Sequence, residues 1–218
     1  MFGDLQNVVP GHPIAGKEFS GVEAADETLY RGSMVILTPA TETRRKAVDI
    51  VSAMWRQCGA QLEEIRVDHH DRVLAATSHL PHVVAFALVD MLAGHQTREE
   101  VFRYSAGGFR DFTRIASGDP VMWRDICLSN RTEISGIMSL LMQRLQAVQQ
   151  LIEEGDGESL QKIFSNAKTT RDALIEKYDK QLAEKNAPIA SSDTANNPPG
   201  GPGSGDERAD SVGENEIP

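Results

Sequence analysis

Residues 78–92 read SHLPHVVAFALVDML, so two histidines lead directly into an almost uninterrupted apolar segment. The segment 83–92 is apolar on nearly every side, which is typical of a helix buried all round. Pro81 removes a backbone hydrogen-bond donor and crowds the preceding turn. We therefore expect a helical run over residues 69–93 that is broken or bent at Pro81, with its histidines beside the protein interior.

Upstream of this helix the pattern is that of an α/β layer. Residues 33–38 (SMVILT) read as a short buried strand. The next segment has apolar residues at helical spacing, with Thr41 or Thr43 as the expected cap. Gly59 ends this helix, and residues 62–67 read as a second strand. Strand, helix and strand form one part of an α/β layer, and this is too little sheet to stand alone.

Two further helices are predicted after residue 118. Asp119 is a preferred N-cap residue and Pro120 suits the first helical position, and the apolar spacing lets that helix continue to Glu154. At about 1.5 Å per residue it would span roughly 50 Å, so we expect a partner subunit to cover part of it. A last helix is expected over residues 158–183. The acidic tail 186–218 is expected to be disordered.

Composition narrows the class of protein. The chain has 218 residues, 40% of them hydrophobic, and a net charge of −10, which predicts one ordinary domain or two small ones with a real core. The absence of a basic stripe argues against nucleic acid, and an acidic chain gains nothing at an anionic membrane. Cys58 and Cys127 are too few for a disulfide framework, and the N-terminus has no signal-peptide pattern. A soluble cytoplasmic protein is predicted.

Four histidines, His69, His70, His79 and His82, cluster in a short span, so a metal site has to be weighed. A zinc site prefers ligands one helical turn apart, with a third ligand nearby. His79 and His82 lie on either side of a proline, and neither cysteine is close in sequence. We therefore assign no metal. His79 fits a core histidine with satisfied hydrogen bonds, whereas His82 is favoured as a functional residue.

His12 lies between Gly11 and Pro13, in a segment expected to be a loop. A histidine, whose usual pKa is about 6.5, suits the acceptance of a proton from a hydroxyl at neutral pH. A loop histidine in solvent would have the same sequence neighbours. The spacing alone supports both interpretations equally.

Residues 107–114 read GGFRDFTR and carry two arginines four apart, with Asp111 between them. The guanidinium fork binds carboxylates through paired hydrogen bonds. One of Arg110 and Arg114 can neutralise Asp111 while the other faces an anionic ligand, and the alternative is a surface ion-pair network at a helix start. Together with the histidines, this segment suggests a buried pocket that holds a small anion and removes a proton from it.

The chain as a whole resembles the prephenate/arogenate dehydrogenase family of tyrosine biosynthesis over about residues 8–175. The resemblance rests on several motifs in the right order: GHPIAG (11–16), His70-Asp71, SHLPH (78–82), GFRDFTRIA (108–116), DPVMWRDI (119–126) and Asn130. It implies an oxidoreductase that uses NAD or NADP to decarboxylate prephenate to 4-hydroxyphenylpyruvate, or arogenate to tyrosine. A homodimer is implied, with no nucleic-acid or membrane partner.

The resemblance also implies a fold. We expect a mainly α protein, in which a C-terminal helical dimerisation domain is preceded by a partial α/β Rossmann remnant and followed by a disordered C-terminal tail. The implied division is a nucleotide-binding remnant over residues 1–67, a helical substrate-binding and dimerisation domain over 68–185, and the acidic tail over 186–218.

The same resemblance assigns roles to side chains. His12 is expected to be the catalytic histidine that hydrogen-bonds the substrate ring hydroxyl, and Arg114 is expected to grip a substrate carboxylate. The other expected pocket residues line or brace the site: His82, Ser78, His70, Asp111 and Trp123. Without the resemblance, Trp123 reads most simply as a core residue.

The sequence departs from the family in one respect. Members open with a strand, Gly-x-Gly-x-x-Gly and a helix, because these glycines let the cofactor pyrophosphate approach the helix N-terminus, and no such turn precedes His12. Cofactor-binding residues therefore stay unassigned. We expect a truncated product, a mistaken start site or one fragment of a split enzyme. The alternative function is a non-catalytic dimerisation or ligand-binding module derived from that enzyme.

Overall fold

The computed structural model describes residues 5–16 and 21–185, and it divides into two compact units, residues 1–160 and 161–218. The tail predicted to be disordered over residues 186–218 lies outside the described residues. The described part is mainly helical with one small sheet, as the sequence predicts.

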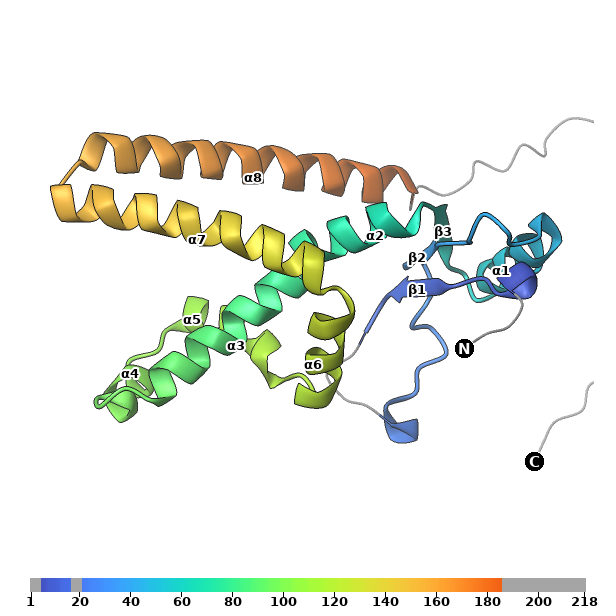
Figure 1. Cartoon of the computed structure of the whole chain (residues 1–218), viewed down its shortest axis with the longest axis horizontal. Helices are drawn as coiled ribbons and strands as arrows, with labels where there is room; N and C mark the ends of the chain where they lie inside the picture. Colours follow the sequence, from blue (N-terminus) through green and yellow to red (C-terminus); the bar gives the residue numbers. More distant parts are fainter. Residues whose placement is uncertain (1–4, 17–20, 186–218) are drawn as a thin grey trace, which may run out of the picture. The chain divides into compact units, whose positions relative to one another are not determined.

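The sheet has three strands in the order β1–β2–β3 (Figure 1). Strand β1 (Gly11–Ile14) runs antiparallel to β2 (Met34–Leu37), with His12 opposite Ile36. Strand β3 (Gln61–Glu64) runs parallel to β2. Because parallel neighbours need a crossover, helix α1 (Arg45–Gln57) connects them. Both strands expected from the sequence are therefore present, the first one residue shorter at each end and the second ending at Glu64, three residues earlier than expected. Two short 3-10 turns, η1 (Leu5–Asn7) and η2 (Val22–Ala24), flank β1.

The core of this layer forms between the middle strand and α1. Val35 and Leu37 of β2 are almost completely buried against Val48 of α1 and Ala60. A central strand covered on both faces reads as a continuous apolar run, which is why MVIL is legible as a strand. Tyr30 and Trp55 close one side of the core, with their rings edge to face and 5.1 Å apart.

Two sequence predictions about this layer are wrong. His12 lies in strand β1, not in a loop, and Pro13 is tolerated there because β1 is an edge strand. Neither threonine caps α1, which begins after Arg44 without a side-chain cap. The Thr43 hydroxyl instead donates to the Val8 carbonyl at 3.1 Å. That bond ties the start of α1 to the segment before β1.

A long helical run follows the sheet (Figure 1) and comprises α2 (Val67–Leu74), the π-helical turn η3 (Ala75–His79) and α3 (Leu80–Ala93). The sequence predicts a run that is broken or bent at Pro81, and a break there is wrong, because Pro81 sits in the first turn of α3 and the run continues through it. The irregularity lies just before it, in η3. Pro81 offers no N–H to the preceding turn, and the N–H of Leu80 donates to the Ala75 carbonyl across the π turn.

Helix Val67–Ala93 is also long and apolar enough, by length and composition, to cross a bilayer. Part of this helix is covered by the rest of the chain. Leu74, Ala75 and Ala85 are buried, and the run packs against η4 (Arg114–Ser117) and α7 (Arg131–Glu154). Two of its histidines, His70 and His79, contact residues outside the run, His12 and Asn130.

The remaining helices correct one further prediction. Short helices α4 (Arg98–Arg103) and α5 (Gly107–Thr113) precede α6 (Pro120–Ser129), which Asp119 caps as expected by accepting from the Met122 N–H at 2.7 Å. The single helix expected over residues 119–154 is wrong, because the chain breaks at Asn130 and α7 begins at Arg131. Gly155, in the left-handed conformation (φ 71°), ends α7, and α8 (Gly157–Lys185) follows.

Candidate functional site

Strand β1 and helix α2 bring two of the predicted site residues into direct contact. The Nδ1 atom of His12 lies 2.9 Å from Nε2 of His70, with the ring centroids 5.2 Å apart. The Nδ1 atom of His70 in turn lies 2.8 Å from the Asp71 carboxylate. Both histidine side chains are partly buried. Residues 58 positions apart in sequence therefore form one hydrogen-bonded chain, Asp71–His70–His12.

The acceptor at one end of this chain determines where the protons lie. The carboxylate of Asp71 can only accept, so His70 donates through Nδ1–H. A neutral His70 then has a bare Nε2, which accepts from Nδ1–H of His12. This leaves Nε2 of His12 with a free lone pair, the state that a general base requires.

The surroundings of His12 also favour its neutral form. Burial of the ring lowers its pKa from the usual value, and the positive charge that His70 can carry lowers the pKa of His12 further. Both effects act in the same direction because each disfavours the imidazolium ion. The bare Nε2 is therefore available at neutral pH.

The histidines of η3 and α3 gather around Trp123 of α6. The His82 ring stacks on the indole, with centroids 3.8 Å apart and an angle of 20° between the planes. Nδ1–H of His82 donates to the Ser78 carbonyl at 2.9 Å, which fixes the ring in place. His79 approaches the same indole edge-on at 6.4 Å. His82 and Trp123, both expected pocket residues, are thus in contact, and Ser78 joins them through its backbone carbonyl.

The backbone at Gly118 leaves room for this indole. A β-carbon at Gly118 would lie 2.5 Å from Nε1 of Trp123, closer than any stable contact. The glycine is needed for space and not for its backbone conformation, since its φ is −66°. The position of Trp123 against His82 therefore depends on an unsubstituted residue 118.

Asn130 joins the two groups of histidines, and the sequence reasoning gave it no role in the site. Its side-chain amide lies 2.8 Å from the Asp71 carbonyl and 3.2 Å from Nδ1 of His79. His79, interpreted as a core histidine, is accordingly a partner within the cluster. The sequence predicts one continuous helix through this position, so no local signal marked Asn130 as a contact of the histidines.

The predicted arginine segment lies on other elements. Asp111 belongs to α5 and Arg114 begins η4, and both of these elements pack against α3. The side chains of both residues are exposed. Asp111 and Arg114 thus lie on elements that pack against α3, the helix that carries His82.

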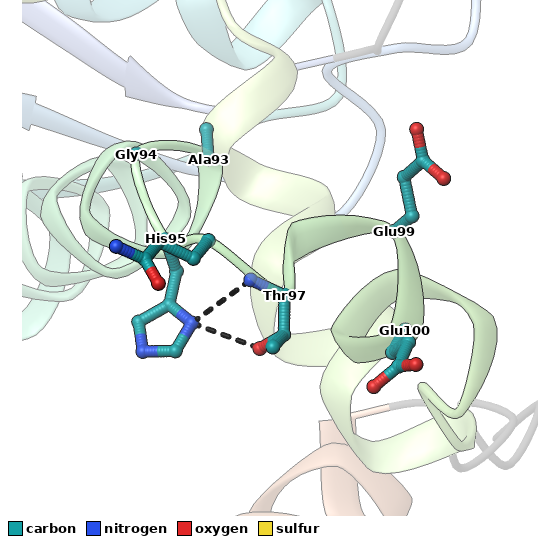
Figure 2. A pocket seen from close by; sticks show the side chains of 7 residues that line it. Ala93, Gly94, His95, Thr97, Glu99 and Glu100 are labelled. Atoms are coloured by element: carbon teal, nitrogen blue, oxygen red, sulfur yellow. Dashed lines mark hydrogen bonds between the residues drawn. The ribbon is translucent and has the colours of Figure 1, made fainter.

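Of two cavities in the described part of the chain, only the smaller one includes a residue of the site. The larger, of about 560 Å³, is lined at the end of α3 and the start of α4 by His95, Thr97, Glu99 and Glu100, among others. Figure 2 shows the His95 ring turned to Thr97, where Nδ1 lies 2.9 Å from the hydroxyl. The carboxylates of Glu99 and Glu100 in the wall of this larger cavity disfavour an anion, and none of the clustered histidines lines it. The smaller, of about 280 Å³, is apolar and has Trp123 in its wall.

Metal ligation is not indicated within the described residues. No group of three or more His, Cys, Asp or Glu side chains there is arranged to hold a metal ion. Cys58 and Cys127 are free thiols, and burial raises the pKa of Cys127. The hydrogen bonds of the site give it imidazole lone pairs and hydrogen-bond donors, which suit proton transfer from a polar ligand.

Comparison with known proteins places this geometry in a family. Residues 66–166 match the family described as prephenate dehydrogenase, dimerization domain, and residues 1–64 match prephenate dehydrogenase, nucleotide-binding domain. The cyclohexadienyl dehydrogenase of Zymomonas mobilis is 37% identical over 174 residues, which is 79% of this chain and 59% of that protein. The prephenate dehydrogenase of Bacillus subtilis is 40% identical over 172 residues, which is 76% of this chain and 45% of that protein.

A solved structure agrees with these matches. The prephenate dehydrogenase of Aquifex aeolicus, in complex with hydroxyphenyl propionate and NAD+, superposes with a TM-score of 0.71 at 42% identity, covering 76% of this chain and 58% of that one. The chain thus spans between 45% and 59% of the length of these relatives. The two family matches lie on either side of residue 65, at the point where the sheet gives way to helices. The chain belongs to the prephenate dehydrogenase family.

Proposed function

We propose that the chain carries the substrate-binding and proton-accepting part of an NAD- or NADP-dependent dehydrogenase of prephenate or arogenate, acting in tyrosine biosynthesis as a cytoplasmic homodimer. The observation that carries the proposal is the hydrogen-bonded chain Asp71–His70–His12, which leaves Nε2 of His12 bare. The match to a dimerization domain supports the homodimer. We retain the division into residues 1–67 and 68–185 as part of this proposal.

His12 is the proton acceptor in this proposal. Its bare Nε2 takes the proton of the ring hydroxyl of the substrate. The resulting negative charge on oxygen favours loss of hydride from the carbon that bears this oxygen. A neutral His70 stabilises the imidazolium that forms on His12 by accepting its Nδ1–H. Asp71 keeps the His70 ring oriented for this hydrogen bond. The chain of three residues thus provides orientation as well as basicity.

Substrate anchoring falls to the residues around α3. Arg114 is proposed to bind a substrate carboxylate through its guanidinium fork. His82, Ser78 and Trp123 would line the pocket, with His70 and Asp111 bracing it. A stacked imidazole and indole supply a flat apolar wall, which suits a cyclohexadiene ring.

The nicotinamide cofactor would accept the hydride that the substrate ring loses. Family members hold its pyrophosphate with a Gly-x-Gly-x-x-Gly turn between a strand and a helix, and the 218-residue sequence contains none. The residues present therefore do not provide that cradle. No residue of this chain is proposed as a ligand of the pyrophosphate.

The proposal is tested by assaying the purified chain with prephenate, and separately with arogenate, in the presence of NAD or NADP. Reduced nicotinamide is followed by absorbance, and binding of each substrate by calorimetry. Turnover at roughly 1–1000 per second or specific binding of either substrate supports the proposal. The absence of both turnover and substrate binding would refute the proposal. Binding without turnover, unaltered by Arg114→Ala, would favour the alternative of a ligand-binding module.

Two substitutions separate the proposed roles. His12→Asn should abolish proton acceptance and leave substrate affinity nearly unchanged. Arg114→Ala should weaken substrate affinity by about ten- to hundredfold, the loss expected of a hydrogen bond between charged groups. An unchanged affinity in Arg114→Ala would show that the carboxylate assignment is wrong.

A further inference from the structure

We propose that Asn130 is a positioning residue that fixes the proton of His79 on Nε2, so that His79 presents a neutral hydrogen-bond donor to the anionic substrate. The proton position follows from this chain alone. The use of the donor rests on the proposed function above.

The orientation of the Asn130 amide is determined by the backbone of α2. Asn130 is 9% exposed, and its side-chain nitrogen lies 2.8 Å from the carbonyl oxygen of Asp71. A carbonyl can only accept, so the group that faces it must be NH₂ and not the amide oxygen. A flipped amide would place two buried oxygens against each other, at a cost of about 1–3 kcal/mol.

The second hydrogen of the same NH₂ group then determines the state of His79. Nδ1 of His79 lies 3.2 Å from that nitrogen. Since the amide nitrogen only donates, Nδ1 must accept and cannot carry a proton. A neutral His79 therefore carries its proton on Nε2. Both Asn130 hydrogens have acceptors in this arrangement.

His79 is in this respect the opposite of its neighbours. Nδ1–H is the donor in His70, in His12 when His70 is neutral, and in His82, whose acceptor is the Ser78 carbonyl. These rings leave Nε2 bare when neutral. His79 alone among the four has the proton on Nε2, so the cluster combines proton acceptors with one fixed donor.

The electrostatics keep that donor neutral. Burial lowers the pKa of His79, and the positive charges that His12 and His70 can carry lower it further, while Asp71 opposes and His82 adds to the lowering. Protonation of His79 would also place a new Nδ1–H against the Asn130 amide. A neutral His79 can donate a hydrogen bond to the anionic substrate while Arg114 supplies the positive charge that pairs with the substrate carboxylate.

The backbone holds Asn130 in position for this role. Its N–H donates to the Ile126 carbonyl at 3.0 Å, and its carbonyl accepts from the Ile134 N–H at 3.1 Å. The residue is thus anchored to the last turn of α6 and the first turn of α7. Its side chain is left to hold α2 and His79 together.

The test reads the ring protons directly by two-bond ¹H–¹⁵N correlation on the full chain, labelled with ¹⁵N-histidine, at neutral pH. The His79 signals are assigned by their loss in His79→Gln. We expect His79 to be protonated on Nε2. In Asn130→Asp the carboxylate accepts, and the proton should move to Nδ1. The matched control Asn166→Asp, in the exposed part of α8, makes the same charge change and should leave His79 unaltered.

Protonation of wild-type His79 on Nδ1 would overturn the inference, whatever the variants do. Protonation on Nε2 that persists in both Asn130→Asp and Asn130→Ala would show that Asn130 is not the cause. The donor role is measured as prephenate affinity, which Asn130→Asp should weaken by at least about tenfold, with the control unchanged. Equal affinities would refute that role. Failure of the wild type to bind prephenate would refute both the donor role and the proposed function, while the ring spectra still decide the proton position.

Discussion

Replacing Gly118 by alanine is expected to displace the indole of Trp123 from the site. The added β-carbon would lie 2.5 Å from Nε1 and 2.9 Å from Cδ1 of Trp123. Ordinary contacts between carbon and its neighbours are about 3.5–4.0 Å, so the ring has to move by roughly 1 Å. The stack of His82 on Trp123, at 3.8 Å, cannot survive such a shift unchanged.

The size of the effect follows from two contributions. Overpacking of a well-filled site costs about 1–3 kcal/mol, and a stacked ring pair contributes about 0.5–1.5 kcal/mol beyond its buried area. Because the shift only partly disrupts the stack, we expect the free energy of unfolding to fall by about 1–3 kcal/mol. Backbone strain contributes nothing, since the φ of Gly118 is allowed to any residue.

The assay is urea unfolding at one fixed protein concentration, with the indole N–H resonance of Trp123 followed in parallel. The matched control is Gly136→Ala in the second turn of α7, where an added β-carbon meets nothing within 4 Å. Alanine in an exposed helix interior should raise the free energy of unfolding by about 0.5–1 kcal/mol. An unchanged stability and an unmoved Trp123 resonance in Gly118→Ala would refute the packing described here.

Two further outcomes are expected. Burial lowers the folded-state pKa of His12 and His79, so the unfolded chain takes up protons below about pH 6.5 while the folded chain resists them. The free energy of unfolding should therefore be at its full value above that pH and decline as the pH falls through it. In His79→Gln the free energy of unfolding should decline less steeply with pH. An equal slope in the variant would contradict the lowered pKa of His79. Asp119→Ala removes the cap of α6 and should lower the free energy of unfolding by about 0.5–2 kcal/mol, measured by the same urea titration; no loss would mean that the cap is replaced by water.

Local pattern was enough to find the elements whose own residues determine them. The apolar run 34–37 reads as a buried strand because both of its faces are covered, and Asp119-Pro120 reads as a helix start because the cap lies within the pair. The motifs around His12, His82 and Arg114 were sufficient to identify the family. In these cases the physical cause lies within a few residues.

The errors occurred where a distant partner decides the structure. Gly11–Ile14 is a strand because it pairs with β2, although glycine and proline make it a poor strand by composition. The helix breaks at Asn130 because its side chain bonds to Asp71 and His79, more than 50 residues away in sequence. The hydrogen bond from His12 to His70 spans 58 residues. Contacts between residues so far apart leave no mark on the hydrophobic periodicity of the sequence.

The most direct measurement is the position of the ring proton on His12 at neutral pH. It is read from the ¹⁵N resonances of the ring, which are assigned with His12→Asn. The hydrogen bonds from Asp71 through His70 require the proton on Nδ1 and a bare Nε2. A proton found on Nε2 of His12 would leave no lone pair facing away from His70, and the base proposed for the substrate hydroxyl would not exist.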